Sequence, residues 1–303
     1  MSVKKALCVG INYYKTNYQL YGCINDAVNV RNMLIDAYDF NPSDIILLTD
    51  DSTNAYTMPT RANILNNLQN LVNNSANCSE IWFHYSGHGS QIVDRSNDEA
   101  DKRDEVIVPY DFAKKGFIVD DEIFAILRNS KCKTIVLFDS CNSGTVGDLP
   151  WNFEYKSPTS FNRTVTNSNK VDNSNIFMLS GCKDSQYSQD FYSTYDKQYQ
   201  GAFTNAFLNC LRKNKHNVEL FALYRDICLY LSQLKMTQLP LLSSSSSTPS
   251  CNFVRATANS EKNVSAANTS TITTSIVSKT KFIPISSNGK SLKKNMKKLL
   301  YSI

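Results

Sequence analysis

Two short motifs of this chain combine residue types that are typical of nucleophilic catalysis. They are His84-Tyr85-Ser86-Gly87-His88-Gly89 and Asp139-Ser140-Cys141-Asn142-Ser143-Gly144. A thiol with its usual pKa of about 8.5 is only a few per cent ionised at neutral pH, so a cysteine nucleophile needs an imidazole that stabilises the thiolate and later protonates the leaving amine. His88 and Cys141 suit these roles. The backbone N–H groups of Gly89 and Cys141 are the donors that we expect at a developing oxyanion.

A structural role is the alternative for each of these side chains. A single histidine or a buried free cysteine most often serves packing or a local hydrogen bond. Two such motifs, each at the end of a predicted strand, favour catalysis instead. We assign the other two histidines, His84 and His216, to structure.

The two motifs follow apolar runs at residues 79–85 and 134–138, whose short length and β-branched or aromatic residues predict buried strands. If these strands are neighbours in a parallel sheet, His88 and Cys141 meet at its carboxyl end, where open α/β sheets bind ligands. Strands and helices alternate along the chain, which is typical of such a sheet. We predict further strands at 6–11, 45–49, 106–110 and 176–179, and helices at 25–38, 60–72, 121–128, 202–212 and 219–234.

We expect one domain over residues 1–254, interrupted by a flexible polar insert at about 149–175, where the periodicity is lost. The insert contains Lys156, Arg163 and Lys170, which are candidate sites of self-cleavage; an uncut, solvated loop is the alternative. Residues 255–303 are rich in Ser, Thr and Lys and predict a disordered tail. Its basic stretch at 292–300 is either solvated or a short amphipathic helix for a membrane or partner.

Composition excludes several classes of protein. The chain has 303 residues, 42% of them hydrophobic, which is sufficient for a sizeable core. Much of the net charge of +5 comes from the tail, so the body is nearly neutral and no nucleic-acid partner is expected. Nine scattered cysteines without a C-x-x-C pair indicate a reducing compartment and no zinc site. Without a signal peptide or a long apolar run, we expect a cytoplasmic protein with no membrane span, and a monomer.

The two motifs, with the histidine 53 positions before the cysteine, resemble those of caspase-like cysteine peptidases. Within that group the chain is similar to type I metacaspases of peptidase family C14 over residues 4–250. The matching segments are Ala6–Asn12, Leu20–Ala27, Ser180–Gln186, Gly201–Thr204 and Gln238–Ser244. This resemblance implies an α/β fold, the caspase-like sandwich, with a mostly parallel central sheet of about six to eight strands flanked by helices. Asn142 departs from the family, where a histidine is more common; because the base is His88, we expect activity to be kept.

The resemblance also implies specificity for Arg or Lys at P1, through an S1 pocket formed by Cys23, Asp26, Ser86 and Asp139. A basic P1 side chain requires carboxylates at the floor of the pocket. Asp139 lies two residues before Cys141 and therefore on the same side of its strand. The structural alternatives are a favourable helix N-terminal charge for Asp26 and a buried hydrogen bond for Asp139.

A calcium site formed by Asp104, Asp120, Asp121 and Asp148 is a further implication of the resemblance. Calcium binds six to eight oxygen ligands and accepts carboxylates from separate segments. Without the resemblance, a solvated acidic surface would be the preferred interpretation. Because Asp148 follows Cys141 by seven residues, bound calcium would order the loop after the nucleophile and act as an activator, not as a catalyst.

The resulting hypothesis is a calcium-activated cysteine endopeptidase that cleaves protein and peptide substrates after Arg or Lys and is able to process itself. One alternative is an inactive caspase-like module that acts through protein binding, against which the intact dyad argues. Another is a caspase proper that cleaves after Asp, against which Asp26 and Asp139 argue.

Overall fold

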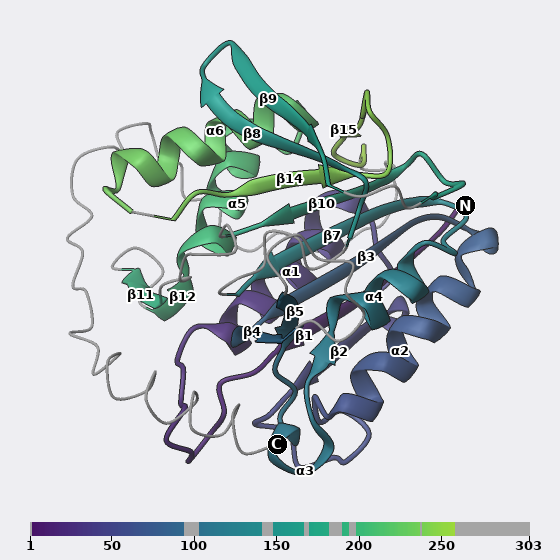
Figure 1. The fold of residues 1–303 in the computed structure, drawn as a ribbon, viewed down its shortest axis with the longest axis vertical. Helices are drawn as coiled ribbons and strands as arrows, with labels where there is room; N and C mark the ends of the chain where they lie inside the picture. Colours follow the sequence, from purple (N-terminus) through teal and green to yellow (C-terminus); the bar gives the residue numbers. More distant parts are fainter. Residues whose placement is uncertain are drawn as a thin grey trace, which may run out of the picture.

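An eight-stranded sheet forms the centre of the molecule (Figure 1). The computed structural model describes residues 2–93, 103–140, 148–166, 170–181, 190–193, 198–236 and 238–257. In spatial order the strands are β2 (Ile45–Thr49), β1 (Val3–Gly10), β3 (Cys78–Ser86), β7 (Lys133–Asp139), β10 (Ile176–Ser180), β14 (Leu241–Ser244), β8 (Trp151–Ser157) and β9 (Ser160–Val165). The first five are parallel, and the last three pairings are antiparallel. The expected mostly parallel sheet of six to eight strands is confirmed.

Helices cover both faces of this sheet, so its central strands are apolar on both sides, as parallel strands usually are. One face packs against α1 (Cys23–Tyr38), α5 (Ala202–Lys213) and α6 (Leu220–Gln233). The other face packs against α2 (Arg61–Asn73) and α4 (Asp120–Leu127), which lie side by side in Figure 1. The expected helices are therefore all present, with boundaries that differ by one or two residues.

Smaller elements border the sheet. They are β4 (Gly89–Val93), β5 (Arg103–Ile107) and β6 (Ile118–Val119) in one sheet, β11 (Asp190–Ser193) with β12 (Gln198–Gly201), β13 (Val218–Glu219) with β15 (Asn252–Phe253), the short helix α3 (Phe112–Lys115), and the 3-10 helices η1 (Pro42–Asp44) and η2 (Ser75–Asn77).

Strands β3 and β7 are parallel neighbours, with Ser86 opposite Asp139 at their carboxyl ends. This pairing confirms that the two sequence motifs begin at one edge of the sheet. The chain passes from β1 outward to β2 and then returns to β3 on the other side of β1. The carboxyl ends of β1 and β3 thus form a topological switch point, the position at which open α/β sheets bind ligands.

The prediction of a flexible insert at 149–175 was wrong for residues 151–165. This segment forms the hairpin β8–β9, which adds two strands to the central sheet through pairing of β8 with β14. The physical reason is a period of two that the polar residues obscure: Trp151, Phe153 and Tyr155 alternate along β8 and pack against the core cluster beside α6. Alternate aromatic residues are sufficient to bury one face of a strand.

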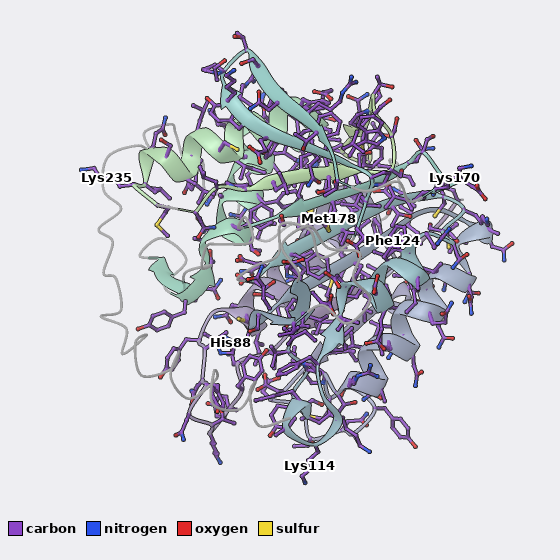
Figure 2. All side chains as sticks on the ribbon, in the orientation of Figure 1. His88, Lys114, Phe124, Lys170, Met178 and Lys235 are labelled. Carbon is purple, nitrogen blue, oxygen red and sulfur yellow. The ribbon has the colours of Figure 1, made fainter. Side chains whose placement is uncertain are left out.

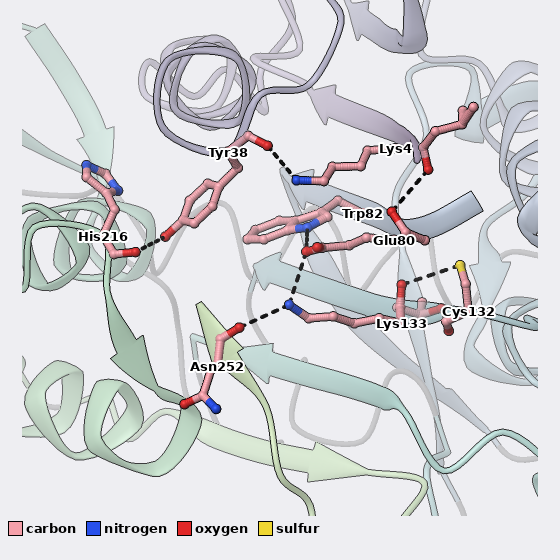
Figure 3. A network of polar contacts seen from close by, with 11 residues as sticks. Lys4, Tyr38, Glu80, Trp82, Cys132, Lys133, His216 and Asn252 are labelled. Carbon is pink, nitrogen blue, oxygen red and sulfur yellow. Dashed lines mark hydrogen bonds and ion pairs between the residues drawn. The ribbon is translucent and has the colours of Figure 1, made fainter. Parts of the chain in front are cut away.

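The amino ends of the strands are joined by a polar network (Figure 3). A carboxylate oxygen of Glu80 accepts the indole N–H of Trp82 at 2.6 Å and lies 3.4 Å from the ammonium of Lys133. Lys133 also donates to the carbonyl of Asn252 at 3.2 Å, and Lys4 donates to the carbonyl of Tyr38 at 2.7 Å at the end of α1. Each charged group here is matched by a partner, which is typical of a structural network.

The last described residues still contact the body, since the N–H of Ala256 donates to the carbonyl of Ala37 at 2.9 Å. The predicted tail beyond residue 257 lies outside the described residues. Across the part of the chain that the structure describes, no helix is both long and apolar enough to span a bilayer.

Candidate active site

His88 stands between the end of β3 and the start of β4. Figure 2 labels it at the opposite end of the central strands from Lys170. Its Nε2 lies 2.7 Å from the carbonyl oxygen of Tyr18. A carbonyl only accepts, so Nε2 carries the proton, and in the neutral imidazole Nδ1 is the basic nitrogen. The tautomer of His88 is therefore set by a backbone group, and Nδ1 is available as a general base.

Burial lowers the pKa of His88 below its usual value, and the hydrogen bond to the carbonyl of Tyr18 opposes this shift. A lower pKa increases the fraction of neutral imidazole at neutral pH. The neutral form is the one that accepts a proton from a thiol.

The strand ends next to His88 and before Cys141 are in backbone contact. The N–H of Gly87 donates to the carbonyl of Asp139 at 3.3 Å. Cys141 follows two residues later and lies outside the described residues, as does Asn142. The structure thus brings together the segments that carry the predicted dyad, while the position of the thiol stays a prediction.

Gly89, the predicted oxyanion donor, is the first residue of the edge strand β4 and lies opposite Ile107 of β5. The preceding pair is hydrogen-bonded, with the N–H of Val108 donating to the carbonyl of His88 at 3.1 Å. Hydrogen-bonded and non-hydrogen-bonded pairs alternate in an antiparallel ladder, so the N–H of Gly89 points away from β5 to the open side of β4. This direction is compatible with an oxyanion donor.

Asp26 lies in the first turn of α1 and is fully buried. Its carboxylate accepts the hydroxyl of Ser86 at 2.8 Å and the N–H of Gly201 at 3.0 Å to each oxygen. The N-terminal end of α1 and these donors place partial positive charges around the carboxylate. Three segments far apart in the sequence therefore position one buried carboxylate.

Asp139 approaches the same position from the end of β7. Its carboxylate accepts the N–H of Thr204 at 2.8 Å, in the first turn of α5. A Cβ added at Gly201 would lie 2.2 Å from a carboxylate oxygen of Asp139 and 2.7 Å from one of Asp26. Both carboxylates thus converge on Gly201, and only a residue without a side chain fits between them.

Cys23, the fourth predicted pocket residue, is buried at the beginning of α1, one turn before Asp26. Its N–H donates to the side-chain oxygen of Asn12 at 3.0 Å, and the next N–H lies 3.3 Å from the same oxygen. Asn12 thereby supplies acceptors for the free N–H groups at the beginning of α1. The four residues predicted for S1 thus occupy one end of the sheet, and two of them, Asp26 and Asp139, converge on Gly201.

The four aspartates predicted for calcium are placed less uniformly. Asp104, Asp120 and Asp148 are buried, whereas Asp121 is exposed. The carboxylate of Asp120 accepts the N–H groups of Glu105 and Asp121, each at 2.9 Å. Burial raises the pKa of Asp120, and the negative charges of Asp148 and Glu105 raise it further.

Mutual repulsion among buried carboxylates fits the donor chemistry of a hard cation such as calcium, which would neutralise it. Asp120 and Asp148, with Glu105 beside them, are the side chains of this kind. Among the described residues, however, no group of three or more His, Cys, Asp or Glu side chains is arranged as metal ligands. The donor types fit calcium, and a complete ligand set stays a prediction.

Sequence reasoning missed Tyr18, whose carbonyl holds the His88 ring, and gave Gly201 and Thr204 no role beyond carrying the family resemblance. A backbone carbonyl has no sequence signal. The segment Gly201–Thr204 begins a predicted helix, and a glycine followed by a helix start is a recognisable anion-binding pattern.

Comparison with known proteins agrees with this geometry. A family model described as metacaspase, peptidase C14 domain, matches residues 4–150. Metacaspase-1 of Kluyveromyces lactis is 36% identical over 289 residues, covering 80% of this chain and 66% of that protein. Metacaspase-1 of Cryptococcus neoformans is 36% identical over 271 residues, covering 74% and 59%. Metacaspase-1A of Aspergillus oryzae is 35% identical over 289 residues, covering 80% and 68%.

The chain thus spans 59% to 68% of the length of these three relatives. Among solved structures, a crystal structure of a Geobacter sulfurreducens protein matches with a TM-score of 0.56 and 23% identity, covering 81% of this chain and 94% of that one. This likeness supports the fold alone.

Proposed function

The chain belongs to the metacaspase family of C14 peptidases, and from this premise we propose that it is a cysteine endopeptidase with Cys141 as nucleophile and His88 as general base. The observation that carries the proposal is the hydrogen bond from Nε2 of His88 to the carbonyl of Tyr18, at 2.7 Å. It leaves Nδ1 as the basic nitrogen at the carboxyl end of β3, beside the strand that leads to Cys141.

In the proposed reaction, Nδ1 of His88 takes the proton of the Cys141 thiol, and the thiolate attacks the carbonyl carbon of the scissile peptide bond. The N–H groups of Gly89 and Cys141 stabilise the oxyanion. The C–N bond then breaks, His88 protonates the departing amine, and an acyl-enzyme thioester remains. Water hydrolyses the thioester and restores the thiol.

We propose that Asp26 and Asp139, with Ser86 and Cys23, form a pocket for Arg or Lys at P1. The support is the convergence of two carboxylates on Gly201, with neutral donors that hold them in place. A buried pair of carboxylates attracts a cation and repels an acidic side chain. A caspase-like preference for Asp at P1 is therefore disfavoured.

Calcium activation is part of the proposal, with Asp104, Asp120, Asp121 and Asp148 as ligands. Bound calcium would supply positive charge that neutralises these carboxylates. Asp148 has φ 42, in the left-handed region, and stands directly after the segment that contains Cys141. A ligand at this position can bias the conformation of that segment.

We also propose that the protein is a cytoplasmic monomer with protein or peptide substrates. The support for the compartment is that the cysteines in the described part of the chain carry free thiols: Cys8, Cys23, Cys78, Cys132, Cys210, Cys228 and Cys251. Free thiols persist in reducing compartments. Self-cleavage near Lys156, Arg163 or Lys170 stays a proposal. Of these, Lys156 lies within β8 and Arg163 within β9, and a residue in a strand is a poorer protease site than a loop residue.

The test is hydrolysis of fluorogenic peptides with Arg, Lys or Asp at P1 by the full chain, with and without millimolar calcium, beside Cys141→Ala. We expect calcium-dependent cleavage after Arg or Lys that Cys141→Ala abolishes. Cleavage after Asp would overturn the pocket, and activity independent of calcium would overturn the activation. A folded wild-type protein that hydrolyses no peptide would favour a binding module.

A further inference from the structure

Two tyrosine hydroxyls connect the backbone of His88 to that of Val108. The N–H of His88 donates to Oη of Tyr13 at 2.9 Å, and this hydroxyl donates to the carbonyl of Val108 at 2.6 Å. The hydroxyl of Tyr85 donates to the carbonyl of His88 at 2.7 Å and accepts the N–H of Val108 at 3.2 Å. The two hydroxyl oxygens lie 3.2 Å apart. Each hydroxyl thus contacts the backbone of both residues, and that of Tyr85 also lies 3.2 Å from the carbonyl oxygen of Val108.

The hydroxyl of Tyr13 takes the place of one bond in a β-ladder. Gly89 is opposite Ile107 in the β4–β5 ladder, so His88 and Val108 are the next pair. An ordinary hydrogen-bonded pair would exchange two N–H···O bonds. Here the N–H of Val108 bonds directly to the carbonyl of His88 at 3.1 Å, but the reciprocal bond passes through Tyr13. An inserted oxygen separates the two backbones on one side, and this sets the angle at which the chain leaves the ladder at His88.

The imidazole itself is held by the same loop. The ring of Tyr13 lies 4.6 Å from the imidazole of His88, with an angle of 38° between the planes. Tyr18, five residues further along the segment between β1 and α1, accepts the Nε2 proton. One loop therefore contacts the face of the imidazole, its edge and its backbone N–H.

Tyr13 is fixed by its surroundings. Its φ of 52 is in the left-handed region, which is unfavourable for a residue with a Cβ. The carboxylate of Asp50 holds this conformation by accepting the N–H groups of Asn12 at 2.7 Å and Tyr14 at 2.8 Å, on either side of Tyr13. Burial raises the pKa of the Tyr13 hydroxyl well above its ordinary value, so it stays protonated at any working pH.

Gly87 shows how closely the two hydroxyls fit the motif. A Cβ added at Gly87 would lie 2.6 Å from Oη of Tyr85 and 3.1 Å from Oη of Tyr13. A side chain at residue 87 would therefore displace the hydroxyls. The absence of a side chain at Gly87 is therefore required by the packing of the two hydroxyls.

We propose that Tyr13 and Tyr85 are positioning residues for His88: their hydroxyls orient the backbone of the general base, and the Tyr13 ring orients its imidazole. The inference rests on the proposed function, because it gives a role to two residues through His88. Both tyrosines act through His88, by contacts to its backbone and its ring, and are therefore positioning residues rather than catalytic ones.

The test compares Tyr13→Phe and Tyr85→Phe with Tyr224→Phe in the full chain. Tyr224 is a matched control because its buried hydroxyl also relays between two backbone groups, accepting the N–H of Tyr155 at 3.1 Å and donating to the carbonyl of Pro240 at 2.9 Å. It makes no contact with His88 among the described residues. All three variants lose one buried hydroxyl and keep the ring.

We expect kcat of Tyr13→Phe to fall by about 10- to 100-fold with KM nearly unchanged, because small displacements of a reacting group reduce rate at this scale. Tyr85→Phe should lose less, since the carbonyl of His88 keeps its bond from Val108. Tyr224→Phe should keep kcat within about twofold of the wild type. Equal losses of kcat in all three variants, or an unchanged kcat in Tyr13→Phe, would overturn the proposal.

A second measurement does not depend on activity. The chain has 3 histidines, so its imidazole NMR signals are few, and His88→Asn identifies those of His88. We expect the Nε2–H tautomer in the wild type, a shift of the His88 signals in Tyr13→Phe, and no shift in Tyr224→Phe. Unchanged His88 signals in Tyr13→Phe would contradict the proposal. A shift in a protein that cleaves no peptide would uphold it and reject the proposed function instead.

Discussion

One face of β3 runs between two regions of the molecule, at the amino and the carboxyl ends of the strand. The carboxylates in these two regions have different kinds of hydrogen-bond and ion-pair partners. Alternate residues Glu80, Trp82, His84 and Ser86 lie along this face from the amino to the carboxyl end of the strand. At the amino end, the charge of Glu80 meets the ammonium of Lys133 and the indole of Trp82. At the carboxyl end, the described donors to Asp26 are the neutral groups Ser86 and Gly201.

Under the proposed function, the difference separates a structural charge from a charge that serves a ligand. A carboxylate that is paired with an ammonium has its charge compensated within the fold. A carboxylate that accepts hydrogen bonds from neutral groups can also bind a cation, which is the role proposed for Asp26. The carboxyl end also holds His88 by a carbonyl and two hydroxyls, all of which are uncharged groups. We therefore expect changes at the carboxyl end to affect activity and changes at the amino end to affect stability.

The largest effect is expected for His88→Asn, which removes the general base. We expect kcat to fall by about a thousandfold or more, as for other members of a catalytic constellation, with little change in melting temperature. The control is His216→Asn near the amino end, where His216 packs edge-on against Tyr38. Asparagine tolerates the left-handed conformation of His216, φ 60. Comparable losses of kcat in both variants, measured by peptide hydrolysis, would contradict the division into two ends.

Asp26→Asn should have the next largest effect. The amide oxygen can still accept the N–H of Gly201, but the negative charge is lost. We expect kcat/KM for Arg and Lys peptides to fall by about 100-fold or more, since leaving a buried charge of the substrate unpaired costs several kcal/mol. Glu80→Gln removes the same charge at the other end and is the control. A preserved kcat/KM in Asp26→Asn would show that this carboxylate is structural.

His84 lies between the two ends, and its neutral state should make stability depend on pH. Burial lowers the pKa of His84 to about 3 from an ordinary value of 6.5, and a backbone hydrogen bond at Leu137 opposes this shift only in part. The unfolded chain therefore binds the proton more readily, so this contribution to stability is complete above pH 6.5 and is lost as the pH falls toward 3.

His84→Leu replaces the imidazole with an apolar side chain and should remove this pH dependence. We expect the free energy of unfolding of the wild type to decrease by a few kcal/mol more than that of His84→Leu between about pH 6.5 and pH 4. Urea unfolding at several pH values measures the difference. If the free energy of unfolding of the two proteins changes with pH in parallel, protonation of His84 does not destabilise the folded state.

The smallest effect is expected for Glu80→Gln. The glutamine keeps an acceptor for the Trp82 indole but loses the charge beside Lys133, which is partly exposed. We expect a loss of about 1 kcal/mol in the free energy of unfolding, and no change in kcat. Thermal unfolding and peptide hydrolysis of the same samples test both statements. A loss of kcat without a loss of stability would contradict the expectation that the amino end of β3 affects stability and not activity.

Much of the fold could be predicted because its signals are local. The apolar runs of β3 and β7 and the periodic helices α1, α2, α5 and α6 are each visible within one window of sequence. The hairpin β8–β9 was missed because its aromatic residues alternate with polar ones in a polar region. Strand β14 was not predicted either, since four residues without a flanking pattern give a weak signal.

In the candidate site too, local motifs could be predicted and contacts between distant segments could not. The motifs around His88 and Cys141 could be found because they stand at strand ends, and the pocket residues followed from a family resemblance. The arrangement around Asp26 could not be found from local pattern, since the N–H that holds it belongs to Gly201, 175 residues away. The role of Tyr13 depends in the same way on Val108, 95 residues away.

By itself, the sequence determined the alternating elements of the α/β fold, the two motifs and the residue types of a thiol peptidase, because these depend on neighbours along the chain. Only the tertiary structure decided which donors hold Asp26 and Asp139, which carbonyl sets the tautomer of His88, and which hydroxyl opens the ladder at Val108. The physical reason is that hydrogen bonds have a range of about 3 Å. Their partners are chosen by the packing that brings distant segments within that range.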